Sequence, residues 1–391
     1  MLWRSSAMPW EAAEVGARCA APWAWLLVTL VLAGCSDPGP KPAELKAFKP
    51  VAAARVAWSV SAGASGNYVF TPAIFDGDVF AAGGGGVSRF DVASGKRRWR
   101  AELPANTILS GGMTVGSGLV LAGTAKGVVH AWSLDGAPLW QSQVSSEVLS
   151  APAVSDGVVV VRSGDGRIHG LDAKDGTRRW EYVATLPPLL IRSSAGVALS
   201  GGSVFAGLPG GKLVALSLAS GAVLWESALS TPRGETELDR TTDVTTTPLV
   251  EENGVCAGAF QGRVGCFELQ RGALLWARNA STASDMGADD RNFYFADERG
   301  HLHAVGRDSG ATLWKQTVLA YRDLGAPAAT GRFVVVGDFD GYLHFFDRED
   351  GALVARIALD GGRISAQPLV VGEGNLLVQT REGTLHAVTV R

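Results

Sequence analysis

The chain has 391 residues, 50 of them glycine, and a formal net charge of −3 at pH 7. Because the charges are nearly balanced and no long basic run occurs, the sequence argues against nucleic acid as a partner. The glycine content indicates many turns, and no long segment of helical period interrupts the short apolar runs. These features favour one all-β repeat fold over several average domains.

The first element is an apolar run that ends on a cysteine. Ala20–Gly34 follows Arg18 and has the length of a signal-peptide core, which is short for a membrane span. Leu32-Ala33-Gly34-Cys35 resembles the bacterial lipobox, in which the cysteine is acylated and becomes the first residue of the mature protein. We therefore predict a lipoprotein signal peptide over residues 1–34 and lipidation at Cys35. The alternative is a buried cysteine in an uncleaved anchor.

The stretch after this cysteine is rich in proline and lysine and poor in apolar residues. Such a composition cannot bury enough apolar surface to fold, so Ser36–Pro50 predicts a disordered tether. Acyl chains contribute roughly 0.8 kcal/mol per buried methylene group, so several chains hold a protein on a membrane. The expected organisation is a leader (1–34), a lipidated cysteine with a flexible tether (35–50) and a folded domain (51–391).

The folded domain is built from one repeated unit, which is clearest in Ser150–Trp180. This unit contains three short apolar runs separated by Asp-Gly pairs, and it ends on a tryptophan four residues after a glycine. Glycine supplies the positive φ of tight hairpin turns, so each unit predicts a four-stranded antiparallel meander. The Gly-x-x-x-Trp signature recurs at Trp99, Trp140, Trp180, Trp225, Trp276 and Trp314, and a seventh copy has Ala355 in place of tryptophan.

A period near 40 residues with four short strands per unit predicts a β-propeller, in which neighbouring blades bury each other's faces. After the seventh copy only three strands remain, and the missing fourth strand is available at the front of the domain, in Arg55–Val60. We therefore predict an all-β, eight-bladed propeller of four-stranded antiparallel blades, closed by pairing of the N- and C-terminal strands. The three final strands are expected in Gln367–Val371, Asn375–Thr380 and Thr384–Val390.

The repeat is violated at two consecutive connections. The two longest intervals between tryptophans follow Trp180 and Trp225, and the extra residues fall between the last strand of one unit and the first strand of the next. These insertions are residues 182–198 and 228–247. Equivalent connections in adjacent blades lie on the same face of a propeller, so we expect the two loops to be neighbours.

The first insertion offers an apolar run beside a cation, and the second is charged. Apolar anchors with flanking charges are typical of a protein-docking patch. The alternative is that Leu189–Ile191 only cap the core beneath a long loop. The residues concerned are Leu189, Leu190, Ile191 and Arg192 in the first insertion, and Glu235, Glu237, Asp239, Arg240 and Asp243 in the second.

Candidate catalytic and metal-binding residues are few. Cys256 and Cys266 flank a turn between two paired strands, so their register decides between a cross-strand disulfide and two half-buried thiols. Two cysteines without nearby histidines fall short of a metal site. His301 adjoins a turn and has no ligand partner in the pattern. From these candidates together we predict no metal, no cofactor and no catalytic residue. The other five histidines occupy one repeat position on separate blades: His130, His169, His303, His344 and His386.

The chain also resembles a known family. Its repeat, clearest in Gly166–Trp180 and Gly300–Trp314, is similar to the PQQ-type propeller repeat. Joined to a lipobox and eight blades, it resembles the BamB family, the propeller lipoproteins of the outer-membrane β-barrel assembly machinery. The likeness covers Val51–Arg391. Two local segments match as well, because Leu189–Arg192 is similar to the family's Leu-x-Leu-Arg loop and Thr242–Pro248 to its Asp-Val-Asp-Thr-Thr-Pro segment.

In that family these two loops bind the periplasmic domains of BamA, the barrel-forming subunit. The resemblance therefore implies BamA as the partner and a non-catalytic scaffold that is lipid-anchored to the outer membrane and faces the periplasm. It also implies a role in offering strand edges or a concave face to unfolded barrel proteins. Thr245 departs from the family's second aspartate, so one charge-assisted contact is lost or replaced. The implied partner-binding residues are Leu189, Leu190, Ile191, Arg192, Asp243 and Thr245.

Two alternatives stay open. A membrane-tethered PQQ-dependent dehydrogenase shares this repeat, but such enzymes typically carry an adjacent cysteine pair and calcium-binding carboxylates over the central channel. The present chain has no adjacent cysteines. The other alternative is a propeller lipoprotein of a different envelope complex.

Overall fold

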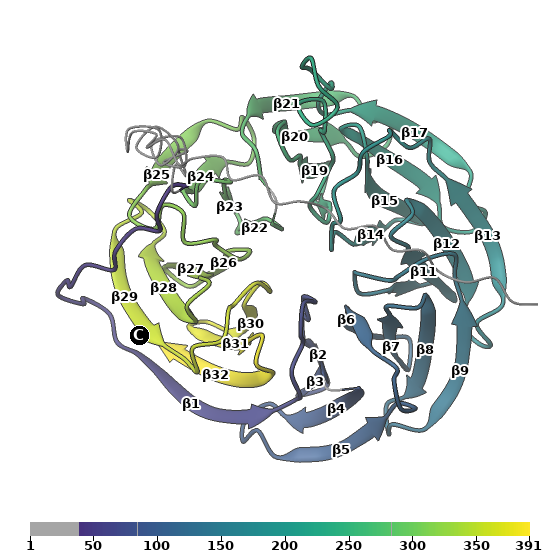
Figure 1. The fold of residues 1–391 in the computed structure, drawn as a ribbon, viewed down its shortest axis with the longest axis horizontal. Coiled ribbons are helices and arrows are strands. Elements are labelled where there is room, and N and C mark those ends of the chain that lie inside the picture. Colours follow the sequence, from purple (N-terminus) through teal and green to yellow (C-terminus); the bar gives the residue numbers. More distant parts are fainter. Residues whose placement is uncertain (1–38, 84, 283) are drawn as a thin grey trace, which may run out of the picture. The chain divides into compact units, whose positions relative to one another are not determined.

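The computed structural model describes residues 39–83, 85–282 and 284–391, so the predicted leader and Cys35 lie outside the described residues. The propeller unit comprises Pro42–Arg391 and contains eight sheets of four antiparallel strands, which form the blades of a ring (Figure 1). This arrangement confirms the predicted all-β, eight-bladed fold. Within the described ranges, the chain has no helix with the length and apolarity that a bilayer span requires.

Blades 1 to 7 each use four consecutive strands, of which the first lies toward the centre of the ring and the fourth at its rim (Figure 1). Blades 1 and 2 contain β2 (Ala73–Phe75), β3 (Asp78–Gly83), β4 (Gly86–Asp91), β5 (Arg97–Glu102), β6 (Leu109–Gly116), β7 (Leu119–Thr124), β8 (Val128–Ser133) and β9 (Pro138–Gln143). Blades 3 and 4 contain β10 (Ala153–Ser155), β11 (Val158–Arg162), β12 (Arg167–Asp172), β13 (Arg178–Val183), β14 (Val197–Ser200), β15 (Ser203–Leu208), β16 (Lys212–Ser217) and β17 (Val223–Ala228).

The next three blades follow the same order. Blades 5 and 6 contain β18 (Leu249–Val250), β19 (Gly254–Gly258), β20 (Arg263–Glu268), β21 (Leu274–Asn279), β22 (Gly287–Ala288), β23 (Asn292–Ala296), β24 (Leu302–Gly306) and β25 (Thr312–Gln316). Blade 7 contains β26 (Ala328–Thr330), β27 (Phe333–Gly337), β28 (Tyr342–Asp347) and β29 (Leu353–Ala358).

Blade 8 joins the two ends of the folded domain. Its strands are β30 (Leu369–Gly372), β31 (Asn375–Gln379), β32 (Thr384–Val390) and, at the rim, β1 (Ala54–Ser61). Strand β1 pairs antiparallel with β32, and Trp58 lies opposite Ala387. Pairing of the N- and C-terminal strands therefore closes the ring, as predicted, and removes the open ends that an unclosed array would expose.

The core consists of apolar layers between blades rather than one central cluster. The second and third strands of a blade are covered on both faces, and every residue of β3 and of β27 is buried. One such layer combines Phe205 and Leu213 of blade 4 with Val255 and Phe267 of blade 5. Each blade thus depends on its neighbours for burial, which explains why a single meander would not be stable alone.

Each repeat tryptophan joins its blade to the next one. Trp180 lies over Gly221 of blade 4, where an added Cβ would meet the indole ring at 2.6 Å, and its Nε1 donates to the Leu218 carbonyl at 2.8 Å. Gly221 also has a φ of 70°, so both the turn and the ring require glycine at this position. The same contact recurs in the pairs Trp58–Gly95, Trp99–Gly136, Trp140–Gly176, Trp225–Gly272, Trp276–Gly310 and Trp314–Gly351.

The segment before β1 is bound to the propeller from Ala43 onward. The carbonyl of Ala43 accepts a hydrogen bond from Arg322 at 3.1 Å, and the guanidinium of Arg356 lies over the Phe48 ring at 5.2 Å. The flexible tether expected over residues 35–50 is therefore too long, because its last part lies along blades 6 and 7. Composition did not reveal this attachment, since much of it consists of hydrogen bonds to backbone carbonyls.

Blade 5 contains the two cysteines whose state the sequence left open. Cys256 of β19 lies directly opposite Cys266 of β20 in the sheet register, and the two sulfur atoms form a disulfide. Both residues are buried in an apolar layer with Met286 and Phe293 of blade 6. The disulfide is thus part of the framework between blades 5 and 6.

Candidate docking site

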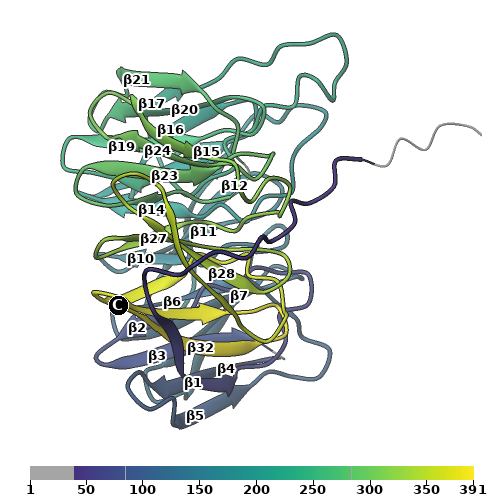
Figure 2. The ribbon, with the colours of Figure 1, turned by 90° about the vertical axis from the view of Figure 1, so that its left-hand side faces the viewer.

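The connections between blades lie on one face of the ring, which we call the connector face. Successive strands of a blade run in opposite directions. The turn between the second and third strands of a blade therefore lies on the same face as the connection to the next blade. The two enlarged connections on this face are residues 184–196, between β13 and β14, and residues 229–248, between β17 and β18. Figure 2 shows the connection after β17 standing out from the face on which the segment leading to β1 begins.

Hydrogen bonds join these two loops directly. The backbone N–H of Ile191 donates to Asp243 Oδ2 at 2.7 Å, and Ser193 Oγ donates to the Thr245 carbonyl at 3.2 Å. The backbone N–H of Gly196 donates to Thr247 Oγ1 at 2.8 Å. The prediction that the two insertions are neighbours is therefore confirmed.

Asp243 and Thr245 lie beneath the surface rather than on it. Both residues are buried, with 4% and 3% of their surface exposed. Asp243 accepts hydrogen bonds from the backbone N–H groups of Ile191 and Gly210, while Thr245 Oγ1 donates to the Thr282 carbonyl at 2.7 Å. In this structure the Asp243 side chain joins the two loops, the Thr245 side chain ties its loop to the connection between blades 5 and 6, and neither is exposed to a partner.

Within the Leu189–Arg192 segment of the 184–196 loop, the exposed residues are one apolar residue and one cation. Leu189 is 42% exposed, Leu190 and Ile191 are half-buried, and the Arg192 side chain is 52% exposed. The Arg192 guanidinium donates two hydrogen bonds to Glu147, at 2.9 and 2.8 Å. These hydrogen bonds lower the pKa of the Glu147 carboxyl, so the ion pair is present at neutral pH.

Two residues that orient Arg192 were not identified from the sequence. Glu147 belongs to the connection between blades 2 and 3, and the ring of Tyr68 lies 5.4 Å from the Arg192 guanidinium carbon. Tyr68 comes from the connection between blades 8 and 1, so three separate connections meet at one guanidinium. Neither residue could be found by spacing, because both lie outside the insertions.

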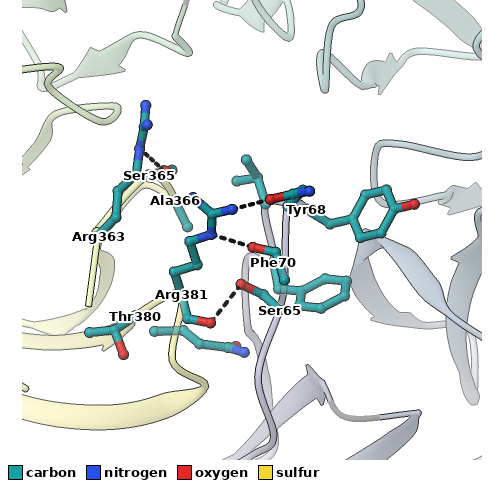
Figure 3. Close-up of a pocket in the computed structure, with 12 residues that line it drawn as sticks. Ser65, Tyr68, Phe70, Arg363, Ser365, Ala366, Thr380 and Arg381 are labelled. Carbon is teal, nitrogen blue, oxygen red and sulfur yellow. Dashed lines mark hydrogen bonds between the residues drawn. The ribbon is translucent and has the colours of Figure 1, made fainter. Parts of the chain in front are cut away.

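Tyr68 is itself held by a polar network, shown in Figure 3. Arg381 of blade 8 donates to the Gly66 carbonyl and to Asn67 Oδ1, and its own carbonyl accepts from Ser65 Oγ at 3.1 Å. These residues line a pocket of about 210 Å³. The Tyr68 ring points away from Arg381 (Figure 3). The network fixes the backbone that carries the ring toward Arg192.

The tip of the 229–248 loop satisfies its own charges. Arg240 lies 3.2 Å from Glu237, and Asp239 Oδ2 accepts hydrogen bonds from the backbone and the hydroxyl of Thr236. Leu238 at this tip is 66% exposed. The tip therefore combines the exposed Leu238 with an ion pair of its own, and Arg192 is paired with Glu147 instead.

A polar layer lies below the two loops. Arg162 donates to the Ala195 carbonyl at 2.9 Å, and Asp285 accepts from the backbone N–H of Thr247 at 2.6 Å. Burial lowers the pKa of Arg162, an effect that the nearby Asp243 and Asp285 carboxylates oppose. Burial likewise raises the pKa of Asp285. This layer ties the first loop to blade 3 and the second loop to the connection between blades 5 and 6, so the two loops form one supported surface.

One histidine expectation needs correction. The five equivalent histidines do lie on separate blades, but His301 is not without partners. His301 Nδ1 and His303 Nε2 each lie 2.9 Å from Asp297 Oδ2. The sequence signal was a second histidine two residues before the repeat histidine, and it occurs in blade 6.

The repeated blades and the contacts between them define the class of protein, a PQQ-like repeat propeller. The crystal structure of BamB from Moraxella catarrhalis matches with a TM-score of 0.79 and 24% identity, covering 86% of this chain and 100% of that chain. The quinohemoprotein alcohol dehydrogenase from Comamonas testosteroni matches with a TM-score of 0.68 and 14% identity, covering 86% and 76%. At such identities these likenesses show the fold alone, which an assembly factor and an enzyme share.

Sequence comparison identifies the family within this class. The family model described as outer membrane protein assembly factor BamB matches residues 83–316 and 298–391. The protein of that name from Bordetella pertussis is 41% identical over 366 residues, which are 92% of this chain and 94% of the relative. The chain belongs to the BamB family of outer membrane protein assembly factors, which confirms the resemblance seen in the sequence.

Proposed function

We propose that the protein is a non-catalytic scaffold subunit of the outer membrane protein assembly machinery that docks onto the periplasmic domains of BamA through its connector face. The observation that carries this proposal is the joining of the two enlarged loops into one surface. This surface presents Leu189 as an apolar anchor beside Arg192. Arginine is suited to such a role, because most of the binding energy at an interface comes from a few well-packed anchors, among which arginine is enriched.

In this proposal the residues of the two loops have different roles. Leu189 and Arg192 make the contacts, with Leu190 and Ile191 packed behind them. Asp243 and Thr245 act as positioning residues, because they fasten the backbone on which the contacts are carried. Glu147 and Tyr68 hold the Arg192 guanidinium in place before binding, which reduces the entropy lost when the complex forms.

The location of the protein follows in part from its family, since assembly factors of this kind work in the cell envelope. We further propose that Cys35 is acylated and anchors the chain in the outer membrane, with the propeller in the periplasm. The segment beginning at Ala43 would then lead from the anchor to the connector face. Unfolded barrel proteins would be a second class of partner, meeting the exposed rim strands or the concave centre of the ring.

The docking proposal is tested by affinity capture of full-length Arg192→Glu protein with BamA. Reversing the charge should weaken binding by roughly 2 kcal/mol, or about 30-fold, because it removes a central anchor and repels Glu147. A matched control is Arg271→Glu, since Arg271 is also exposed and paired with a glutamate but lies outside the two loops. Equal capture of wild type and Arg192→Glu would contradict the docking surface.

The absence of catalysis is tested separately. Wild-type protein is supplied with PQQ and calcium, and alcohol-dependent reduction of a dye is followed. We expect no turnover above the rate without protein. Turnover would favour the dehydrogenase alternative and contradict the scaffold role.

A further inference from the structure

Blade 6 contains a second feature of the connector face, between its second and third strands. Asp297 directly follows β23 and precedes the turn, His301 lies just before β24, and His303 lies within β24. The three potential ligand atoms, Asp297 Oδ2, His301 Nδ1 and His303 Nε2, all lie within 4.8 Å of one another. Among the residues that the structure describes, no other group of three such side chains is drawn together.

The distances within this group fit a small divalent ion. Ligands about 2.0–2.1 Å from a tetrahedral metal ion are separated from one another by about 3.3 Å. The carboxylate oxygen already lies 2.9 Å from each imidazole nitrogen. A small lengthening of these two contacts, with the two imidazole nitrogens within 4.8 Å of each other, would place the three atoms around one ion.

The surrounding structure fixes two of the three ligands. Asp297 Oδ1 accepts hydrogen bonds from the backbone N–H groups of Arg299 and His301, at 3.0 and 2.9 Å, which orients the carboxylate. The His303 ring stacks on Phe295 with 4.8 Å between centroids and 6° between planes.

Comparison with blade 7 shows what is special here. At the same repeat position, Asp338 Oδ2 lies 2.9 Å from His344 Nε2 and accepts a hydrogen bond from Arg322 at 2.7 Å. In blade 7 a guanidinium therefore occupies the second position beside the carboxylate oxygen. Blade 6 has Ser281 at the position of Arg322, and Ser281 donates to Glu298 instead. Blade 6 therefore replaces a permanent cation with a second imidazole, which can bind a metal.

We propose that Asp297, His301 and His303 form a binding site for a divalent transition-metal ion of the zinc type. Two imidazoles and one carboxylate match the ligands of zinc and cobalt and disfavour magnesium and calcium, which require mainly oxygen ligands. Three protein ligands leave a fourth position for water or for a group of a bound partner. The Lys315 ammonium, 3.8 Å from Asp297 Oδ2 and on a partly exposed side chain, would turn toward solvent when the ion binds.

The test uses the purified full-length protein, treated with chelator and titrated with zinc chloride by calorimetry and with cobalt chloride by visible absorption. We expect one ion per chain and the absorption of tetrahedral cobalt. His301→Tyr should lower the affinity at least about 10-fold, because it removes a ligand. Tyrosine is the residue of blade 7 at that position, so the metal-free variant should unfold at the wild-type temperature.

Two further variants separate metal binding from a purely structural hydrogen-bond cluster. Lys315→Met should raise the zinc affinity, because it removes a cation beside the site, and a lowered affinity would contradict the proposal. His130→Gln alters the equivalent histidine of blade 2 and should leave binding unchanged. The proposal is overturned if the wild type binds no zinc, or if His301→Tyr binds it as tightly as the wild type.

Discussion

The contacts between blades are repeated around the ring, whereas the contacts made by the two enlarged connections occur once. The Trp180–Gly221 contact is one of a series repeated around the ring, with the same ring, the same glycine and the same hydrogen bond from the indole. The contacts of Arg192 with Glu147 and Tyr68 occur once and combine three different connections. The repeated contacts stabilise the propeller, and the unique contacts give one part of its face a distinct surface. Substitutions should therefore affect either stability or binding, according to the region.

The largest effect on stability is expected at a repeated contact. Trp180→Ala removes a buried indole and its hydrogen bond and should lower the free energy of unfolding by about 3–5 kcal/mol. Trp180→Phe, which keeps most of the ring, should cost less. Chemical denaturation of the three proteins measures these differences. An unchanged unfolding midpoint for Trp180→Ala would contradict the role assigned to the tryptophan contacts.

An intermediate effect is expected at the disulfide of blade 5. Cys256 and Cys266 are 10 residues apart, and closing a loop of this size stabilises a protein by about 3 kcal/mol in the chain-entropy description. The double variant Cys256→Ser/Cys266→Ser should lose roughly that amount and still be captured by BamA at the wild-type level. A reducing agent should destabilise the wild type and leave the double variant unaffected. Equal stability with and without reductant in the wild type would show that the bond is absent.

The smallest effect is expected below the docking surface. Asp243→Asn leaves one of two backbone N–H groups without its charged acceptor and should loosen the 184–196 loop by about 1–3 kcal/mol. Capture by BamA should fall by about 10-fold, because the loop that carries Arg192 is less well ordered. Asp239→Asn is the matched control, since it alters an exposed aspartate at the tip of the neighbouring loop. Wild-type capture by Asp243→Asn would show that loop order does not matter for docking.

The regular features of the fold could be predicted from the sequence because they are periodic. The spacing of the tryptophans gave the number of blades, and Trp58 before the first full unit indicated that β1 completes blade 8. The same spacing located the two insertions and their adjacency, since equivalent connections share a face. Periodicity thus carries information over the whole ring without any knowledge of side-chain positions.

The partners of individual side chains could not be predicted in this way. Glu147 and Tyr68 approach Arg192 from distant connections, and such meetings depend on shifts of a few ångströms that no spacing encodes. The burial of Asp243 was missed because a charged loop residue is usually exposed, whereas here it accepts two backbone hydrogen bonds. The attachment of residues from Ala43 onward was missed because composition describes what a segment can bury, not which carbonyls it can present.

The most direct test of the docking surface is site-specific photo-crosslinking in cells that contain the complete assembly machinery. A photoreactive amino acid is placed at Leu189 in one protein and, as a control, at Leu275, which is 56% exposed on the rim strand β21. Our account predicts an adduct with BamA from position 189 and none from position 275. An adduct from position 275 together with none from position 189 would contradict it.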